Sequence, residues 1–249
     1  MLTHPTLEQL RSLKLSGMVK ALEEQAGIPD LKELSFEERL GLLVDREVTV
    51  RRNRKLQTLL KKAKLRLNAS IEDIDYRHPR DLDKSLVLSL ASCQWVEEHN
   101  NILIIGPTGV GKSYLACALA QKACREGYRT LYFRLPRLLQ ELAMARGDGR
   151  YGKMLINLAK NDLLVIDDWG LTPLDDHGRR DILEILEDRH NIRSTIFTSQ
   201  LPLNNWHEII GDPTLADAIL DRLVHNAYKI NLKGESMRKR LKSLTQAGH

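Results

Sequence analysis

The sequence lacks long apolar runs, and this absence excludes two classes of protein. None of its apolar stretches approaches the roughly 18 residues that a transmembrane helix needs. The first residues, MLTHPTLEQLRSLKLSGM, contain no unbroken apolar core, so the sequence predicts no signal peptide. We therefore expect a protein that does not act in a membrane.

Cysteine is scarce as well, and its spacing excludes two kinds of site. The sequence has three cysteines, Cys93, Cys117 and Cys124, with no C-x-x-C pair among them. An odd number at these spacings argues against a disulfide framework and against a zinc site. Cys117 and Cys124 are placed to share one helix face, where both are expected to be buried thiols. This usage predicts a reducing, cytoplasmic compartment.

The 249 residues suffice for one or two domains, and their composition, 42% apolar and 29% charged, excludes a disordered or fibrous chain. Leucines and Met18 follow a helical period over residues 7–22, which Gly27-Ile28-Pro29 ends. Ser35 and Glu38 form a predicted capping box that opens a long second helix. A third helix is expected over about 82–98. The first part of the chain is thus predicted to be helical.

After residue 100 the pattern changes to short apolar runs that alternate with helical segments. Five runs are expected to be strands: 102–105, 130–133, 163–166, 195–197 and 228–232. Strands that alternate with helices predict an α/β fold with a five-stranded parallel sheet. We therefore expect a small all-helical domain over 1–75 and an α/β domain over 76–249, with a mobile loop at 147–152.

A phosphate-binding motif follows the first predicted strand. Residues 106–113 match G-x-x-x-x-G-K-[ST] and precede a predicted helix, the context that this motif requires. Glycines let backbone N–H groups surround a phosphate, with Lys112 at its β- and γ-phosphates and Ser113 at Mg²⁺. The alternative is a chance glycine-rich loop. The predicted nucleotide-binding residues are Gly106, Pro107, Thr108, Gly109, Val110, Gly111, Lys112, Ser113 and Tyr114.

Two acids end the third predicted strand. Asp167 and Asp168 follow the apolar run 163–166, at the end of a strand where ligands bind in open α/β sheets. We expect Asp167 to hold Mg²⁺ together with Ser113, and Asp168 to orient or deprotonate the attacking water. A helix cap or a turn is the alternative role for each acid. Arg222 and Arg238 flank the last predicted strand, and each is either a cation for the transition state or an exposed surface arginine.

These motifs resemble those of the AAA+ ATPases of the DnaC/DnaA-like initiator clade. The resemblance makes 106–113 the Walker A motif, 163–168 the Walker B motif, Arg222 the arginine finger and Arg238 the sensor 2 residue. It implies a sensor 1 residue at Gln200, with Thr198 or Ser199 as alternatives. Asp168 stands where Glu is usual, which predicts slow turnover. Only eleven residues follow Arg238, so little or no helical lid is expected.

The N-terminal half narrows the resemblance to the IstB-like transposition helper ATPases of bacterial insertion sequences. The segments that carry it are 10–18, 36–47, 51–66, 73–76 and 90–95. The resemblance implies that the protein binds ATP and duplex DNA, forms homo-oligomers through ATP interfaces and directs a partner transposase to target DNA. A DnaC-like helicase loader and a nucleotide-binding protein without hydrolysis are the alternatives.

Positive charge is concentrated in residues 46–66, which hold nine basic side chains and the single acid Glu47. On a helix, one arc holds Leu56, Leu59, Leu60, Ala63 and Leu67, and the other holds every basic residue of the block except Arg52. No aromatic residue interrupts the block, so contacts to duplex phosphates are favoured over stacking on single strands. An exposed helix face and a membrane-surface helix are the alternatives. The predicted DNA contacts are Arg51, Arg52, Arg54, Lys55, Lys61, Lys62 and Lys64.

Overall fold

The computed structural model describes residues 5–27 and 34–237, and the chain divides into two compact units, Met1–Thr58 and Leu59–His249. The boundary predicted after residue 75 lies too late in the chain. Ala69, Ile71 and Ile74 are buried in the core of the second unit, so the segment that contains them folds with the α/β part. Each unit is described separately below.

The first unit contains α1 (Pro5–Ser12), α2 (Ser16–Ala26) and the first part of α3 (Phe36–Ala63). The predicted first helix is therefore two helices, separated where Lys14 adopts a left-handed backbone with φ of 58°. The predicted capping box at the start of α3 is confirmed. The Ser35 N–H donates to Glu38 Oε2 at 2.8 Å, and the Glu38 N–H donates to Ser35 Oγ at 3.2 Å.

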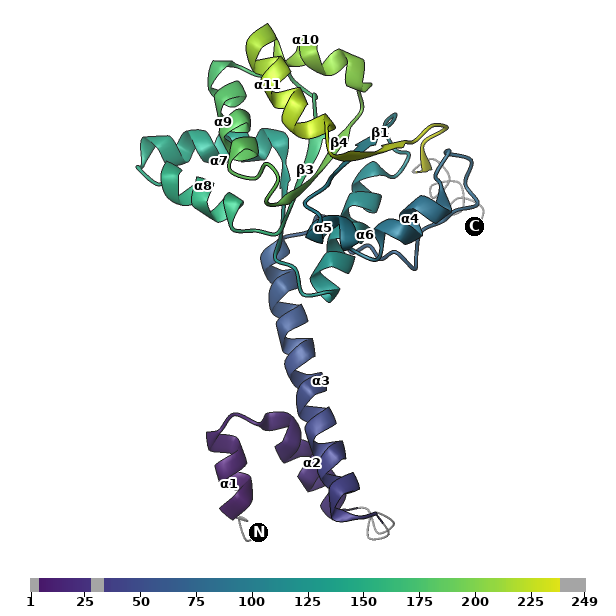
Figure 1. The fold of residues 1–249 in the computed structure, drawn as a ribbon, viewed down its shortest axis with the longest axis vertical. Helices are drawn as coiled ribbons and strands as arrows, with labels where there is room; N and C mark the ends of the chain where they lie inside the picture. The colour runs from purple at the N-terminus through teal and green to yellow at the C-terminus, as the bar shows by residue number, and fades with distance from the viewer. Residues whose placement is uncertain (1–4, 28–33, 238–249) are drawn as a thin grey trace, which may run out of the picture. The chain divides into compact units, whose positions relative to one another are not determined.

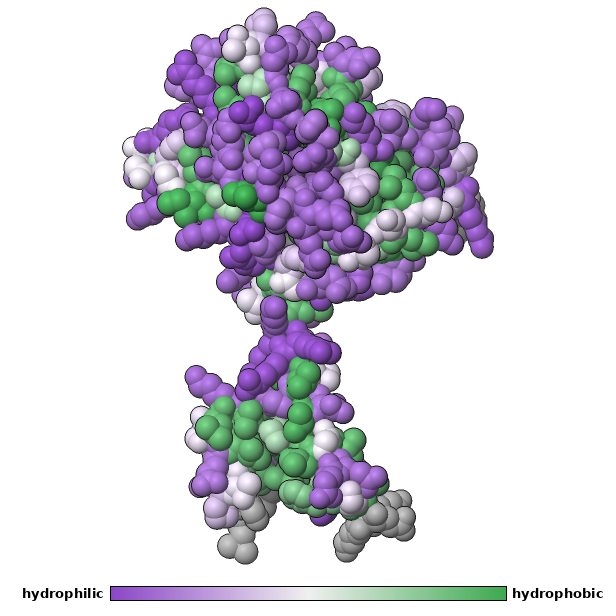
Figure 2. Space-filling view, in the orientation of Figure 1, coloured by the Kyte–Doolittle hydropathy of each residue, from purple (hydrophilic) through white to green (hydrophobic). Residues whose placement is uncertain are grey.

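A buried carboxylate joins α2 to α3 within the first unit. Glu47 Oε2 accepts hydrogen bonds from the N–H groups of Gly17 at 2.6 Å and Met18 at 3.2 Å. Arg51 Nε donates to the other oxygen, Oε1, at 2.7 Å. A Cβ at position 17 would lie 2.6 Å from Glu47 Cα, so the close approach of the helices requires glycine there. Much apolar surface remains on this unit (Figure 2), including the exposed Phe36, Leu40, Leu42, Val44 and Val48.

The second unit is built on a five-stranded parallel sheet in the order β2-β3-β4-β1-β5. All five predicted strands are confirmed. Their bounds are β1 (Asn101–Ile105), β2 (Thr130–Arg134), β3 (Leu163–Trp169), β4 (Ser194–Ser199) and β5 (Ala227–Asn231). β1, β3 and β4 are buried along nearly their whole length because helices cover both faces of the sheet.

Alternate residues of each strand enter two separate cores, as the two-residue period of a strand requires. Ile102 and Ile104 of β1 pack on one face against α4 (Lys84–Leu90), α5 (Gln94–Glu97) and α6 (Lys112–Arg125). Leu103 and Ile105 pack on the other face. The helices of that face (Figure 1) are α7 (Leu135–Gly147), α8 (Tyr151–Ala159), α9 (Asp176–Glu187), α10 (Trp206–Ile210) and α11 (Pro213–Val224).

Two features of the second unit differ in detail from the sequence-based expectation. The predicted helix over 82–98 is interrupted, because Cys93 adopts a left-handed backbone with φ of 62° between α4 and α5. A short 3₁₀ helix, η2 (Leu203–Asn205), precedes α10.

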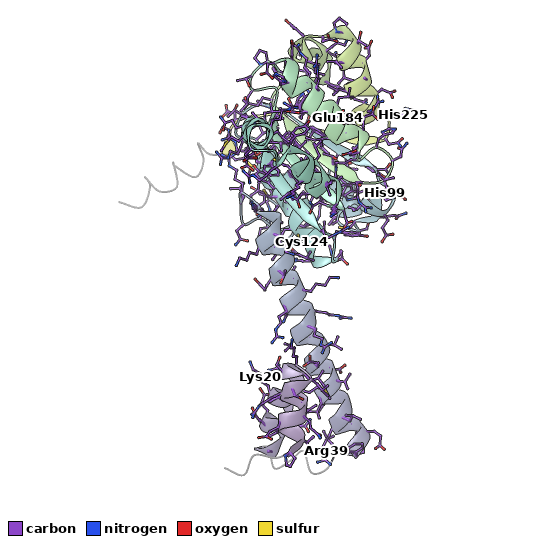
Figure 3. All side chains as sticks on the ribbon, turned by 90° about the vertical axis from the view of Figure 1, so that its left-hand side faces the viewer. Lys20, Arg39, His99, Cys124, Glu184 and His225 are labelled. Carbon is purple, nitrogen blue, oxygen red and sulfur yellow. The ribbon has the colours of Figure 1, made fainter. Side chains whose placement is uncertain are left out.

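The three cysteines are free and buried, among them Cys124 in α6 (Figure 3). Over residues 5–27 and 34–237, no helix is both long and apolar enough to cross a membrane.

Candidate nucleotide site

The predicted phosphate loop connects the end of β1 to the start of α6, so the strand, loop and helix occur in the predicted order. Gly109 and Gly111 have φ of 87° and 100°, which side chains rarely tolerate. Gly111 caps the N-terminus of α6, whose first turn includes Lys112 and Ser113. The loop therefore presents backbone N–H groups and the positive end of a helix dipole toward one point, the arrangement that binds phosphate.

Lys112 is buried and bonded to the carbonyl oxygens of the loop that surrounds it. Its Nζ donates to the carbonyl oxygens of Gly106 at 2.6 Å and Pro107 at 2.8 Å. Both acceptors belong to residues at the start of the phosphate loop. The ammonium group is thus held at the loop, where phosphate oxygens can become further acceptors.

A buried arginine, Arg80, is hydrogen-bonded to the phosphate loop, and the sequence did not predict this contact. Arg80 Nη1 donates to the carbonyl oxygen of Val110 at 2.9 Å, and Nη2 donates to that of Asp75 at 2.9 Å. A Cβ at position 111 would collide with the Arg80 guanidinium, a second reason for glycine there. Burial lowers the pKa of Arg80. No motif marks this residue, because its contact with the phosphate loop joins residues that are 30 positions apart.

The first acid of β3 is fully buried and surrounded by hydroxyl groups. Ser113 Oγ donates to Asp167 Oδ1 at 2.9 Å, and the Tyr132 hydroxyl donates to Oδ2 at 2.5 Å. Thr198 Oγ1 donates to Oδ1 as well. Burial, followed by the hydrogen bond to Asp167, raises the pKa of Tyr132. The Ser113 hydroxyl and the Asp167 carboxylate, adjacent hard oxygen donors beside a phosphate site, fit Mg²⁺.

The second acid lies where β3 becomes irregular. The register between β3 and β4 shifts between Ile166 and Trp169, and Asp168 has φ of 64°. Aspartate tolerates this left-handed conformation better than most residues, and strained backbone often occurs at functional sites. The Asp168 N–H donates to Thr198 Oγ1 at 3.1 Å, while its Oδ2 accepts from Arg134 Nε at 2.6 Å.

The three sensor 1 candidates have different surroundings. Gln200 Oε1 accepts a hydrogen bond from Thr108 Oγ1 of the phosphate loop at 2.6 Å. Thr198 contacts both acids, as described above, whereas Ser199 Oγ donates to the Trp169 carbonyl oxygen at 3.0 Å. Gln200 and Thr198 are therefore beside the predicted chemistry, and Ser199 is occupied by the backbone of β3.

Most of the predicted nucleotide residues face one cavity of about 670 Å³. Such a volume is typical of small-molecule sites. Three arginines that were not predicted to be nucleotide-binding residues, Arg66, Arg80 and Arg134, also line the cavity. Its lining includes Arg66, Arg80, Thr108, Gly109, Gly111, Lys112, Ser113, Tyr114, Arg134, Asp168 and Gln200.

Arg222 is remote from the phosphate loop of its own chain. Its carbonyl oxygen accepts from Asn101 Nδ2 at 3.3 Å, at the start of β1, whereas the phosphate loop follows the end of that strand. The Arg222 guanidinium donates to the Ala218 carbonyl oxygen at 2.8 Å and pairs with Glu187. Arg238, the predicted sensor 2 residue, lies outside the described residues.

All seven predicted DNA contacts are exposed, but they do not form one continuous helical face. The helix ends at Ala63, and Lys64 has φ of 52°, so Lys64 lies beyond it. The predicted apolar arc also ends there, and Leu67 is exposed. Arg54 donates to Ser16 Oγ at 2.8 Å, and Arg51 pairs with Glu47. Within the described residues, the side chains of Arg52, Lys55, Lys61 and Lys62 form no hydrogen bond or ion pair, so these four remain available.

Comparison with known proteins agrees with the geometry. The family described as IstB-like ATP binding protein matches residues 8–245. A Sinorhizobium fredii protein named as an insertion sequence ATP-binding protein is 55% identical over 239 residues, which cover 96% of this chain and 98% of the relative. The protein so named for insertion sequence IS21 of Pseudomonas aeruginosa is 36% identical, with 97% and 89% covered.

Two solved structures share the fold of about two thirds to three quarters of this chain. The DnaC helicase loader superposes with a TM-score of 0.54 at 24% identity, over 68% of this chain and 99% of that one. DnaA from Aquifex aeolicus superposes with a TM-score of 0.57 at 18% identity, over 74% and 56%. The predicted fold, that of an AAA+ P-loop NTPase, is confirmed.

Proposed function

Because the chain belongs to the family of IstB-like ATP binding proteins, we propose that it is an ATP-dependent, DNA-binding helper of transposition. In this proposal it assembles on duplex target DNA and recruits or stimulates a partner transposase. The observation that carries the proposal is the single cavity that brings the phosphate loop and Asp168 together. The three cysteines of the chain, which are buried and form no disulfide, support a reducing, cytoplasmic setting.

The proposed chemistry is hydrolysis of ATP. Lys112 and the loop N–H groups bind the phosphates, while the Ser113 hydroxyl and Asp167 hold Mg²⁺, which supplies charge neutralisation at the phosphates. Asp168 orients the attacking water and accepts its proton. Gln200, which is bonded to Thr108 of the phosphate loop, or Thr198, which is bonded to Asp167, is proposed to sense the terminal phosphate. The short side chain of Asp168 and its hydrogen bond to Arg134 support slow turnover. We propose that assembly or DNA stimulates this turnover.

Assembly is proposed to complete the site. Arg222 and the phosphate loop lie at opposite ends of β1, so this arginine cannot serve its own chain. We therefore assign it to the nucleotide of a neighbouring subunit, where it stabilises the charge that develops in the transition state. Its ion pair with Glu187 must then open on assembly. Arg238 is kept as the proposed sensor 2 residue.

DNA binding is assigned to the exposed cations of α3 and of the segment that follows it. Arg52, Lys55, Lys61 and Lys62 are exposed and are assigned the principal phosphate contacts, because their side chains form no hydrogen bond or ion pair within the described residues. Arg51, Arg54 and Lys64 are secondary contacts. Contacts of this kind recognise the phosphate backbone and carry little sequence preference.

The experiment that tests the proposal is a phosphate-release assay with and without duplex DNA. The proposal predicts slow release that rises when DNA is added and that requires Mg²⁺. Asp168→Asn is expected to bind ATP and to release phosphate roughly a hundredfold to a thousandfold more slowly. Capture of a transposase from an insertion sequence of this family, with a replicative helicase as the competing bait, separates a transposition helper from a helicase loader. Capture of the helicase alone would contradict the proposal.

A further inference from the structure

Arg66 lies apart from the other cations of the basic block. The helix α3 ends at Ala63, and the left-handed Lys64 turns the chain before Arg66 is reached. Arg66 Nη1 then lies 3.6 Å from Asp167 Oδ2 and 3.6 Å from Asp168 Oδ2. One guanidinium group thus faces both acids of the nucleotide site.

Asp167 and Asp168 already have positively charged partners, whose charge a bound metal ion could replace. Arg134 Nε lies 2.6 Å from Asp168 Oδ2, so two arginines balance the two carboxylates. Asp167 is fully buried, and a buried carboxylate without a nearby cation is costly. A divalent cation at Ser113 and Asp167 would supply the same compensation. Arg66 and the divalent cation would therefore both neutralise the negative charge of the same acidic pair.

We propose that Arg66 is an internal competitor of the divalent cation, which sets how much Mg²⁺ the site needs before nucleotide is retained. The inference rests on the proposed magnesium site. In the chain without nucleotide, the guanidinium neutralises the acidic pair. When Mg²⁺ and nucleotide bind, Arg66 moves away from the pair, and the cost of that movement weakens the apparent affinity for the metal.

The surroundings of Arg66 favour this role over two others. A cation that only bound DNA would gain nothing from contact with a fully buried acid. A ligand for the phosphates would be expected beside the loop N–H groups, whereas Arg66 faces the carboxylates. Its side chain is 40% exposed, so it can leave the acids without being withdrawn from a packed core.

The test is a titration with Mg²⁺ of the full chain and a fluorescent, non-hydrolysable ATP analogue, starting from EDTA. Arg66→Gln is expected to lower the half-saturating Mg²⁺ concentration roughly fivefold, the scale of a partly exposed ion pair. Arg66→Lys keeps the charge without the guanidinium fork and is expected to give a smaller decrease. Arg137→Gln removes the same charge from a pair with Glu141 on α7, and it is the matched control with no expected shift.

The outcomes separate this inference from the proposed function. A wild-type protein that retains nucleotide equally well in EDTA would overturn the magnesium site and the inference together. Normal Mg²⁺ dependence in wild type with an unchanged or higher half-saturating concentration in Arg66→Gln would overturn the inference alone. Weaker nucleotide binding by Arg66→Gln at saturating Mg²⁺ would make Arg66 a phosphate ligand instead. Circular dichroism of each variant establishes that the fold is retained.

Discussion

The two units each bury a carboxylate, and they satisfy it in opposite ways. In the first unit Glu47 accepts from the backbone N–H groups of Gly17 and Met18 and from Arg51. In the second unit Asp167 accepts from three hydroxyl groups, with Arg66 nearby. Backbone donors of a helix cannot leave, whereas hydroxyl groups rotate and can turn their oxygen toward a cation.

The kind of donor indicates which buried acid is structural and which can bind a ligand. Glu47 occupies the unpaired donors at the start of α2, the role that a helix cap performs. Asp167 is held by groups that can exchange one partner for another without loss of the fold. Burial alone would have made the two acids look alike; the kind of donor distinguishes them.

The largest effect on ATP hydrolysis is expected from Arg222, which is proposed to act on the nucleotide of a neighbouring subunit. Arg222→Ala should bind ATP normally and lose roughly a thousandfold of assembly-dependent hydrolysis, the usual scale for an arginine supplied by a neighbour. Steady-state phosphate release measures this loss. Mixing with Lys112→Ala should restore part of the activity, because some interfaces then combine an intact arginine with an intact loop. Normal turnover by Arg222→Ala alone would contradict the assignment.

The second acid of β3 should matter for hydrolysis and not for binding. Asp168→Asn keeps the size of the side chain but cannot accept the proton of water, so hydrolysis should fall by roughly a hundredfold to a thousandfold. Single-turnover hydrolysis and nucleotide titration measure the two properties separately. If the variant hydrolyses ATP at the wild-type rate, the catalytic carboxylate lies elsewhere.

Lys112 should matter for binding itself. Lys112→Ala removes the cation from the β- and γ-phosphates, and the affinity for ATP should fall roughly a hundredfold, the scale of a charged hydrogen bond. Titration of a fluorescent ATP analogue measures the loss. Lys122→Ala, on the same helix α6 but paired with Glu126, is the control and should bind normally. Equal affinities for both variants would sink the assignment.

The smallest effect should appear in the first unit and leave the nucleotide site unchanged. Glu47→Gln should speed hydrogen exchange at the amides of Gly17 and Met18 roughly tenfold, with ATP affinity at the wild-type value. The Arg51 hydrogen bond holds the pKa of Glu47 below its usual value, opposed by partial burial. The stabilisation is therefore present above the usual pKa and is lost as the pH falls through the lowered one. Protection of these amides, measured relative to their intrinsic exchange rates, that does not fall in acid would contradict the role of Glu47.

The sequence predicted those parts of the molecule that depend on local pattern. The strands, the capping box and the phosphate loop each arise from residues that are close in the chain. Arg80 and Tyr132 were not assigned to the site, because the site residues that they contact, Val110 and Asp167, are 30 and 35 residues away. One signal was available. Arg134 ends β2 and pairs in register with Asp167 of β3, so two neighbouring strand ends place a cation beside the acids.

The basic block was predicted less well, for a physical reason. Periodicity placed residues 46–67 on one helix, but a left-handed Lys64 ends it and carries Arg66 to the acidic pair. Charge composition records how many cations a segment holds and not where each points. The roles of Arg222 and the DNA contacts depend on other molecules, and they remain predictions.

The central claim is that cations of α3 bind the backbone of duplex DNA, and a salt series of fluorescence anisotropy on a labelled duplex tests it most directly. If about six cations neutralise phosphates, the logarithm of affinity should fall against that of salt with a slope near −5. Replacing Arg52, Lys55, Lys61 and Lys62 by Ala should flatten the slope by roughly three to four. Exchanging lysine and arginine at these positions preserves charge and should leave the slope unchanged. An unchanged slope in the alanine variant would contradict the claim.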